Sequence, residues 1–452
     1  MKRSLVLAGG GMRVAWQAGV VRALAEEGLT FDHIDGTSGG IMTAGMMLSG
    51  VSPQDMCANW SGVDVKDFGS ALPLGDYLKG PWSLPAIGDA DGLLGKVFPA
   101  LGIDDAEIRR RASMPDATEG TFNVVEFTEK RCHSIDATQI DAELMAAGMS
   151  LPIFLTPLRR DGRIWTDAVW MRDANVQEAL RRGANEVWLI WCIGNSPYWG
   201  DGPLEQYVHM IEMSAMGALN ADFEAAAATG RDFVLHVVRP ENPLPLDPEF
   251  YLGRIDADTL IAMGYRDARA YLDTMTSSGV AKEPSCTAMS EPAPGVRFND
   301  TLHGQYDGGP VTFRATVVLP SGGGDARLSG YLDHTALGGR VFLSDGRVQS
   351  TGEDVSYIAR ARIKGAWEDV TVTRTFHDDP GPDAWADTRN ARLDIGGQPA
   401  ATLQMTVGDA AALLASVEPV GSHGLGQRAA AVASFAGSGL REAFRRYGGL
   451  AV

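Results

Sequence analysis

The chain has 452 residues, of which 45% are hydrophobic and 21% are charged, and its formal net charge is −18. This composition is typical of a globular protein, and the length exceeds the roughly 250–300 residues that one hydrophobic core usually serves, so two domains are expected. The negative charge disfavours both a nucleic-acid binder with a basic surface and electrostatic attachment to anionic membranes. We therefore expect no nucleic-acid partner.

Redox and targeting features point to a reducing compartment. The four cysteines show neither a CxxC pair nor a metal-ligand spacing, so we expect free thiols, a cytoplasmic location, and no bound metal or calcium. The apolar run LVLA near the N-terminus is too short for a signal peptide, and no run of about 18 apolar residues predicts a membrane span. Transient contact with a membrane surface stays open, and the oligomeric state is not predicted.

The N-terminal residues predict alternating strands and helices. Residues 4–8 form a short apolar run typical of a buried strand, and a helix with one apolar face follows from about Met12 to Gly28. A second strand at 31–35 leads into GTSGG at 36–40 and then into a small apolar helix. This alternation predicts an α/β fold with parallel strands.

The same alternation continues over residues 1–275, which we expect to form a three-layer α/β/α domain. Residues 52–115 are broken by prolines and carry aromatic residues such as Trp60 and Trp82, so we expect a cap region over the sheet. The remaining elements are expected as strands at 122–127, 131–135, 187–193 and 233–238 and as helices at 203–229 and 257–275.

A second domain is expected after a change in composition. Residues 276–295 are rich in Ser, Pro and Ala with little periodicity, which predicts a linker. Residues 296–452 contain short alternating runs separated by Gly or Asp turns, which predicts an antiparallel β-rich domain of barrel or sandwich type. Residues 408–448 are amphipathic and predict a C-terminal helix.

Ser38 lies at the centre of GTSGG. A serine between glycines fits the sharp strand-to-helix turn of a nucleophile elbow, where Gly36, Gly39 and Gly40 would let the strand and the helix pack closely. The N-terminus of the following helix favours developing negative charge. The motif is short, however, and Ser38 could instead simply cap the helix.

The sequence GGGMR at 9–13 ends the first strand and opens the first helix. The amides of Gly9, Gly10 and Gly11 could stabilise the oxyanion of a tetrahedral intermediate, because glycine has no side chain to screen them. A phosphate loop is the competing interpretation, but the dinucleotide and Walker patterns are absent, and a purely structural turn also stays open. Arg13 could hold this loop by pairing with a carboxylate, or could be a solvated helix residue.

GGGMR followed by GTSGG about 25 residues later resembles the patatin-like phospholipase family, and the likeness covers about residues 1–275. The family uses a Ser–Asp dyad whose aspartate begins a D-G-G or D-G-A motif after a short strand. The matching position is Asp167 in RIWTDAVW, with Ala168 where the family has glycine, a change that could tighten the turn. The resemblance implies that Ser38 is the nucleophile and Asp167 its base, without a cofactor.

The dyad requires that Asp167 bind the Ser38 hydroxyl directly. Aspartate has an ordinary pKa of ~3.9, so burial would have to raise the pKa of Asp167 for it to serve as a base. The alternative is a Ser–His–Asp triad with His209 or His236, which follow the aspartate in the order that α/β-hydrolases use. No sequence feature selects either histidine.

These features predict a serine hydrolase that cleaves lipid or fatty-acyl esters through an acyl-enzyme. Methionines near the site, such as Met42 and Met46, could line an apolar groove or merely fill the core. Two alternatives are an acyltransferase that uses the same dyad with an alcohol or sterol acceptor, and a non-catalytic lipid-binding protein.

The C-terminal runs WADTRNARLDI and FAGSGLREAFRRYGG resemble an accessory β-rich segment found with cholesterol-oxidase-like flavoenzymes. The resemblance implies a lipid-handling module, and the alternative is a passive domain. The chain has no flavin-binding glycine fingerprint, so no flavin is expected.

Overall fold

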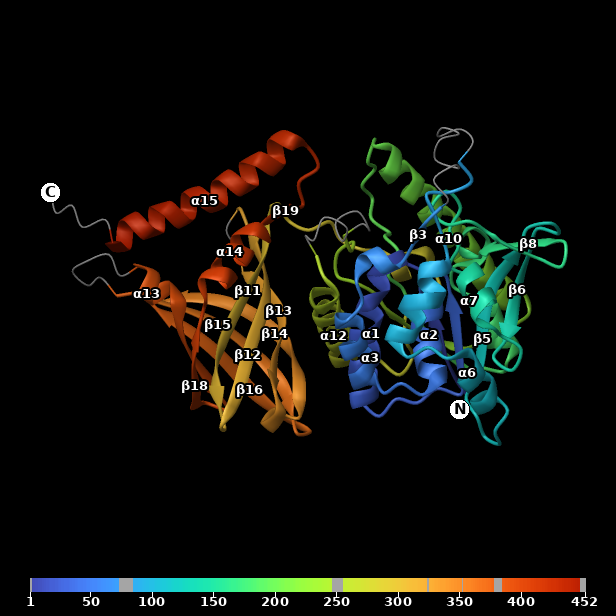
Figure 1. Ribbon diagram of the computed structural model, residues 1–452, viewed down its shortest axis with the longest axis horizontal. Coiled ribbons are helices and arrows are strands. Elements are labelled where there is room, and N and C mark those ends of the chain that lie inside the picture. The colour runs from blue at the N-terminus through green and yellow to red at the C-terminus, as the bar shows by residue number, and fades with distance from the viewer. Residues whose placement is uncertain are drawn as a thin grey trace. The chain divides into compact units, whose positions relative to one another are not determined.

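The computed structural model describes residues 2–72, 84–245, 255–322, 325–351, 353–377 and 384–447. The chain forms two compact units, Met1–Ser290 and Glu291–Val452, which Figure 1 shows in blue to yellow and in yellow to red. Much of the expected linker at 276–295 belongs to the first unit. The Val280 amide donates to the Leu235 carbonyl at 2.7 Å, and Met289 is buried in the core of this unit.

Within the described residues, an eight-stranded mixed sheet forms the centre of the first unit. Its strands are β1 (Arg3–Leu7), β2 (His33–Thr37), β5 (Glu119–Glu126), β6 (Arg131–Asp136), β7 (Leu158–Arg160), β8 (Arg163–Asp167), β9 (Glu186–Ile190) and β10 (Val234–Val238). The strands β10, β9, β1, β2 and β5 are parallel neighbours in that order, as expected from the strand–helix alternation. The strands β6, β7 and β8 extend the sheet by antiparallel pairing.

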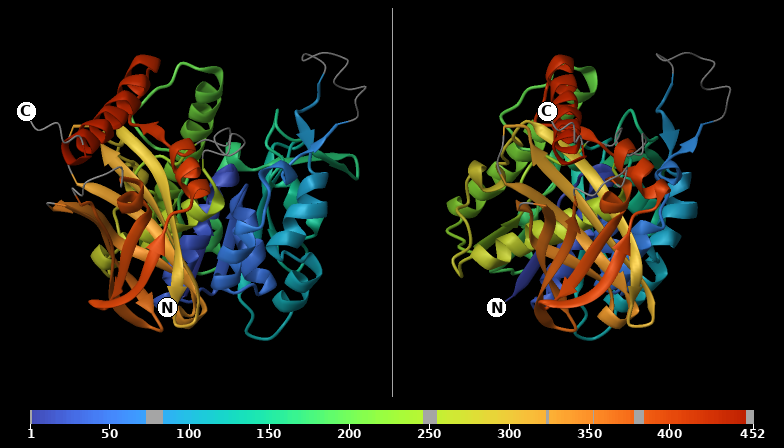
Figure 2. Two further views of the ribbon diagram at one scale, coloured as in Figure 1. Left: turned by 60° about the vertical axis from the view of Figure 1, so that its left-hand side comes forward. Right: turned by 90° about the vertical axis from the view of Figure 1, so that its left-hand side faces the viewer.

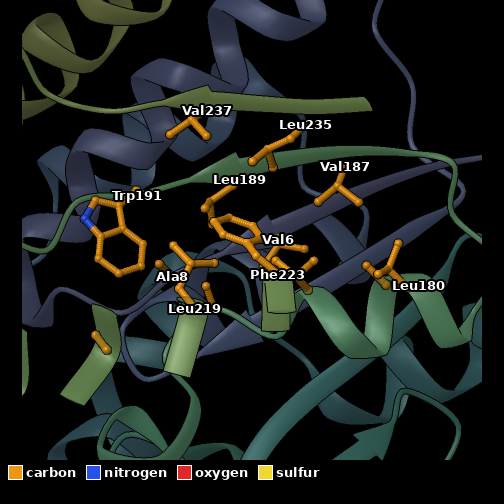
Figure 3. Packing of buried hydrophobic residues seen from close by; sticks show 14 of the residues in the cluster. Val6, Ala8, Leu180, Val187, Leu189, Trp191, Leu219, Phe223, Leu235 and Val237 are labelled. Atoms are coloured by element: carbon orange, nitrogen blue, oxygen red, sulfur yellow. The ribbon is translucent and has the colours of Figure 1, made fainter. Parts of the chain in front are cut away.

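Helices cover both faces of this sheet. Leu189 of β9 packs with α10 (Pro203–Ala228) in the cluster of Figure 3, whereas the adjacent Trp188 meets Tyr271 of α12 (Ala257–Thr274) edge to face. Successive strand residues point to opposite faces, so α10 and α12 lie on opposite sides. This arrangement confirms the three-layer α/β/α domain.

Close helix packing completes one of these outer layers. The helix α1 (Ala15–Glu26) contacts α12 through Gly19 and Gly264, where a Cβ atom would lie 1.9 Å from a carbonyl oxygen of the other helix. The helix α3 (Pro53–Ser61) packs against both. The other described helices of this unit are α2 (Gly40–Ser49), α5 (Phe98–Leu101), α6 (Asp105–Ala112), α7 (Ala142–Ala147), α8 (Val169–Arg172) and α9 (Val176–Arg181).

The expected cap region contributes to the core more than to a substrate surface. Trp60 of α3 is buried. Met42 and Met46 of α2, which precedes the cap region, are buried as well, and this burial fits packing in the core. Trp82 lies outside the described residues. No helix in the described ranges combines the length and the apolarity needed to span a membrane.

The second unit is a closed antiparallel barrel. Its strands are β11 (Gly295–Tyr306), β12 (Gly309–Pro320), β13 (Ala326–His334), β14 (Gly339–Thr351), β15 (Asp354–Ile363), β16 (Ala366–Thr375), β17 (Asn390–Ile395) and β18 (Gln398–Gln404). Each strand pairs with the next, and β18 pairs back onto β11, which closes the barrel. The prediction of an antiparallel β-rich domain is confirmed, in its barrel form.

The predicted helix over 408–448 is divided in two. The helix α14 (Val407–Ala415) is followed by the short strand β19 (Glu418–Val420) and then by α15 (Leu425–Tyr447), which lies near one end of the barrel in Figure 2. Pro419 cannot donate a helical hydrogen bond. Its segment pairs instead with the first residues of β11, and this pairing interrupts the helix.

Candidate active site

Ser38 lies on a sharp turn between β2 and α2, with a positive φ of 51°. Such a backbone conformation is uncommon for a residue other than glycine and marks a functional or strained position. The glycines around it are needed for close packing. A Cβ atom on Gly40 would lie 2.3 Å from the Leu7 carbonyl oxygen, and one on Gly39 or Gly36 would lie 2.6 or 2.9 Å from its nearest neighbour.

The structure brings Ser38 and Asp167 together. The Ser38 hydroxyl donates a hydrogen bond to Asp167 Oδ2 at 2.6 Å, and both side chains are buried. The other carboxylate oxygen, Oδ1, accepts the Val169 amide at 2.9 Å, which fixes the carboxylate plane. Asp167 is thus oriented toward the serine without a third residue between them.

The strand β5 sets the spacing of this pair. Thr37 of β2 pairs with Asn123 of β5, and Asp167 of β8 pairs with the next residue, Val124. The strand β6 occupies the other edge of β5 over both positions, so β2 and β8 follow one another along the same edge. Asp167 consequently lies directly beyond the end of β2, where Ser38 begins the turn.

Burial raises the pKa of Asp167 to about 7, and the hydrogen bonds from Ser38 and from the amides of Val169 and Ala168 offset part of this effect. A carboxylate with a pKa near neutrality can accept and return a proton under physiological conditions. Ala168 has φ −90° and ψ −4°, a region open to any residue. Alanine therefore replaces the glycine expected here without backbone strain.

The two histidines considered for a triad are engaged elsewhere. The His236 ring stacks on Trp188 at 4.3 Å between centroids, and its Nδ1 lies 2.9 Å from the Tyr271 hydroxyl. His209 Nδ1 lies 3.0 Å from Glu212. Since Ser38 binds Asp167 directly, the geometry favours the dyad over a triad.

Both backbone polar groups of Gly9, its amide and its carbonyl, are engaged in hydrogen bonds. Its amide donates to Asp173 Oδ1 at 2.9 Å, and its carbonyl accepts the Cys192 thiol at 3.0 Å. The Gly9 amide is therefore not free to meet an oxyanion, in contrast to the expectation from the sequence. Sequence reasoning missed Asp173, because only the fold brings it to this loop.

The rest of the glycine loop leaves two donors open. Within the described residues, the amides of Gly10 and Gly11 have no protein acceptor. Gly11 has a φ of 60°, which glycine adopts readily. Arg13 Nε donates to the Gly10 carbonyl at 3.0 Å, so Arg13 holds the loop through a backbone oxygen and not through a carboxylate.

Apolar side chains that are half-buried or exposed follow Asp167 in the structure. The Tyr207 ring lies 5.6 Å from Phe154 and 5.5 Å from Trp170, which follows Asp167 by three residues. Burial and, secondarily, the negative charge of Asp167 raise the pKa of Tyr207. Ile153, next to Phe154 in sequence, and Met213, on the same helix α10 as Tyr207, are 59% and 58% exposed. We call this surface the apolar rim; it comprises Ile153, Phe154, Trp170, Tyr207, Met210 and Met213.

Comparison with known proteins identifies the region that carries this site. Residues 5–180 match the model of a family described as patatin-like phospholipase, a span that includes the glycine loop, Ser38 and Asp167. Among solved structures, VipD from Legionella pneumophila is similar, with 15% identity, a TM-score of 0.33 and coverage of 60% of this chain and 67% of that chain. No curated protein matches the chain.

Proposed function

We propose that this chain hydrolyses fatty-acyl esters with Ser38 as nucleophile and Asp167 as base, because residues 5–180 match the model of the patatin-like phospholipase family, which supports a lipid hydrolase activity in general. The observation that carries the proposal is the 2.6 Å hydrogen bond from the Ser38 hydroxyl to Asp167 Oδ2. A serine is a weak nucleophile at neutral pH and needs an adjacent base.

The reaction proceeds in two halves. Asp167 accepts the hydroxyl proton as Ser38 Oγ attacks the ester carbonyl, and the tetrahedral intermediate collapses to an acyl-serine while Asp167 returns the proton to the leaving alkoxide. A water molecule then gives a proton to Asp167 and attacks the acyl carbon. Ser38 leaves with that proton, and a free fatty acid is released.

The oxyanion of each intermediate needs hydrogen-bond donors. In this proposal the amides of Gly10 and Gly11 supply them, because they have no acceptor within the described residues. Loss of one such donor typically raises the barrier by ~3–4 kcal/mol. Arg13 contributes by holding the Gly10 carbonyl, and hence the orientation of the next peptide.

The apolar rim supports a lipid substrate. Phe154, Tyr207 and Trp170 form a chain of aromatic contacts that starts three residues from Asp167. Burying an apolar chain against such a surface contributes ~0.8 kcal/mol for each methylene group. A long acyl chain would gain affinity along the rim, while a short one would depend on the dyad alone.

Active-site labelling tests this proposal. A fluorophosphonate probe should label the wild type and fail to label Ser38→Ala, while Ser150→Ala, which removes another buried serine, should label normally. A series of p-nitrophenyl esters would show whether kcat/KM rises with chain length. Added alcohol would reveal acyl transfer as an ester product. If the folded wild type neither labels nor cleaves any ester, the enzyme proposal fails and lipid binding alone becomes the better explanation.

A further inference from the structure

Asp173 is a second acid beside the nucleophile. Its side chain is 0% exposed, and Oδ1 accepts the Gly9 amide at 2.9 Å. A Cβ atom built on Gly9 would lie 2.5 Å from Asp173 Oδ1 and 3.3 Å from Ser38 Oγ, so the carboxyl group and the nucleophile flank the same α-carbon. The acid therefore contacts the oxyanion loop directly next to Ser38.

Asp173 has no directly paired cation in the described part of the chain. Within the described residues, Asp173 has no salt bridge, and its second oxygen, Oδ2, is buried without a hydrogen-bond partner. The neighbouring Arg172 is directed elsewhere and pairs with Asp222 at 3.3 Å. A buried carboxylate with a single hydrogen bond and no counterion is costly, whereas the neutral acid is tolerated.

We propose that Asp173 is a positioning residue that works as the neutral acid, fixing the Gly9 peptide beside Ser38, and that its ionisation switches the hydrolase off at alkaline pH. The proposal rests on the hydrolase function proposed above. A neutral carboxyl group accepts the Gly9 amide through its carbonyl oxygen and places no charge near the oxyanion. An ionised one would place a negative charge beside the oxyanion, which the enzyme has to stabilise in the transition state.

The charges that face Asp173 agree with this assignment. Burial raises the pKa of Asp173 to about 8, the Gly9 hydrogen bond lowers it, and the negative charge of Asp167 on β8 raises it further. Arg13 in the glycine loop acts in the opposite direction. Another titratable group at this peptide is the Cys192 thiol, which donates to the Gly9 carbonyl.

The pH profile of labelling tests the proposal. An acid is about 90% ionised one pH unit above its pKa, so the wild-type rate of fluorophosphonate labelling should fall about tenfold between its optimum and about pH 9. Asp173→Asn keeps a neutral oxygen for the Gly9 amide and cannot ionise. It should label within a few-fold of wild type near pH 7 and faster than wild type at about pH 9.

Two further variants test whether Asp173 positions the Gly9 peptide or only fills space in the core. Asp173→Ala removes the acceptor, so its kcat should fall by up to ~10²-fold at every pH with little change in KM, because the loop loses its fixed geometry. Asp222→Asn, which alters another buried acid, should keep the alkaline decline of the wild type.

Three results would overturn the proposal: an unchanged alkaline decline in Asp173→Asn, equal losses in the Asn and Ala variants at all pH values, or a wild-type rate that stays flat to about pH 9. The wild-type pH profile needs no variant, so this test can be made even if the substitutions prevent folding. If the wild type labels at pH 7 but any of these results is found, only the role of Asp173 fails. Complete absence of labelling would instead remove the hydrolase function and this inference with it.

Discussion

Acidic side chains are buried in both units, and one acid of the barrel is compensated differently from the two acids at the candidate active site. In the barrel, Asp300 accepts two hydrogen bonds from the Arg374 guanidinium, at 2.6 and 2.9 Å, and one from the Tyr357 hydroxyl at 2.7 Å. In the α/β unit, Asp167 and Asp173 are equally buried, and neither has a salt bridge within the described residues.

The comparison distinguishes a buried acid that a cation holds from two that lack one. A guanidinium fork binds a buried carboxylate through two parallel hydrogen bonds and fixes it in place, which suits a barrel core. Burial without a cation instead raises the pKa of Asp167 to about 7 and that of Asp173 to about 8. Acids poised near neutrality can exchange protons, and such groups gather at active sites.

The largest expected effect is on catalysis by Asp167→Asn. The amide keeps the shape of the side chain but cannot accept the Ser38 proton, so kcat should fall by ~10²–10⁴-fold. Ester hydrolysis by the purified variant would measure it, with circular dichroism to verify folding. If the variant kept activity within a few-fold of wild type, Asp167 would not be the base.

A smaller but still severe effect is expected in the barrel. Arg374→Met leaves Asp300 buried without its cation, which should lower the free energy of unfolding of this unit by ~3–5 kcal/mol. Replacing both residues by apolar ones should cost less than the single change. Hydrogen exchange over β11 to β18 would measure the loss, and an unaltered exchange pattern would contradict a structural role for the pair.

The pH dependence of hydrolysis should show the raised pKa of Asp167. Because Asp167 accepts a proton only when ionised and its pKa is raised to about 7, kcat/KM should fall about tenfold for each pH unit below that value. Burial also raises the pKa of Asp35 to about 7, so Asp35→Asn is the control and should retain the decline. A decline centred near pH 4 would mean that Asp167 is not perturbed.

The smallest effect is expected for an ion pair on the barrel surface. Arg392 Nε lies 2.9 Å from Asp394 Oδ2, with the arginine side chain 65% exposed. Water screens such a pair, so Arg392→Ala should change the free energy of unfolding by less than about 1 kcal/mol. Denaturant unfolding would measure this difference. If Arg392→Ala lowered the free energy of unfolding as much as Arg374→Met, burial would not decide how much an ion pair contributes to stability.

The sequence predicted the parts of this molecule that depend on local pattern. The glycine spacing around Ser38 predicts a strand-to-helix turn, and alternating polarity predicts the β-rich unit. The contact between Gly9 and Asp173 could not be predicted, because it joins residues 164 positions apart. Barrel closure depends likewise on the pairing of β11 with β18, two strands with many residues between them.

Because β2 and β8 both pair with β5, the position of the dyad depends on β5 and only weakly on the length of the loops around it. Asn123 pairs with Thr37, which precedes the nucleophile, and Val124 pairs with the base Asp167, so consecutive residues of β5 set the spacing of the dyad. The segment between β5 and β8 could therefore change in length over evolutionary time without resetting the dyad, provided that Ser150 keeps its place, because its carbonyl accepts the Asp167 amide at 3.3 Å. A one-residue insertion between Asn123 and Val124 would instead turn the carboxylate to the opposite face of the sheet.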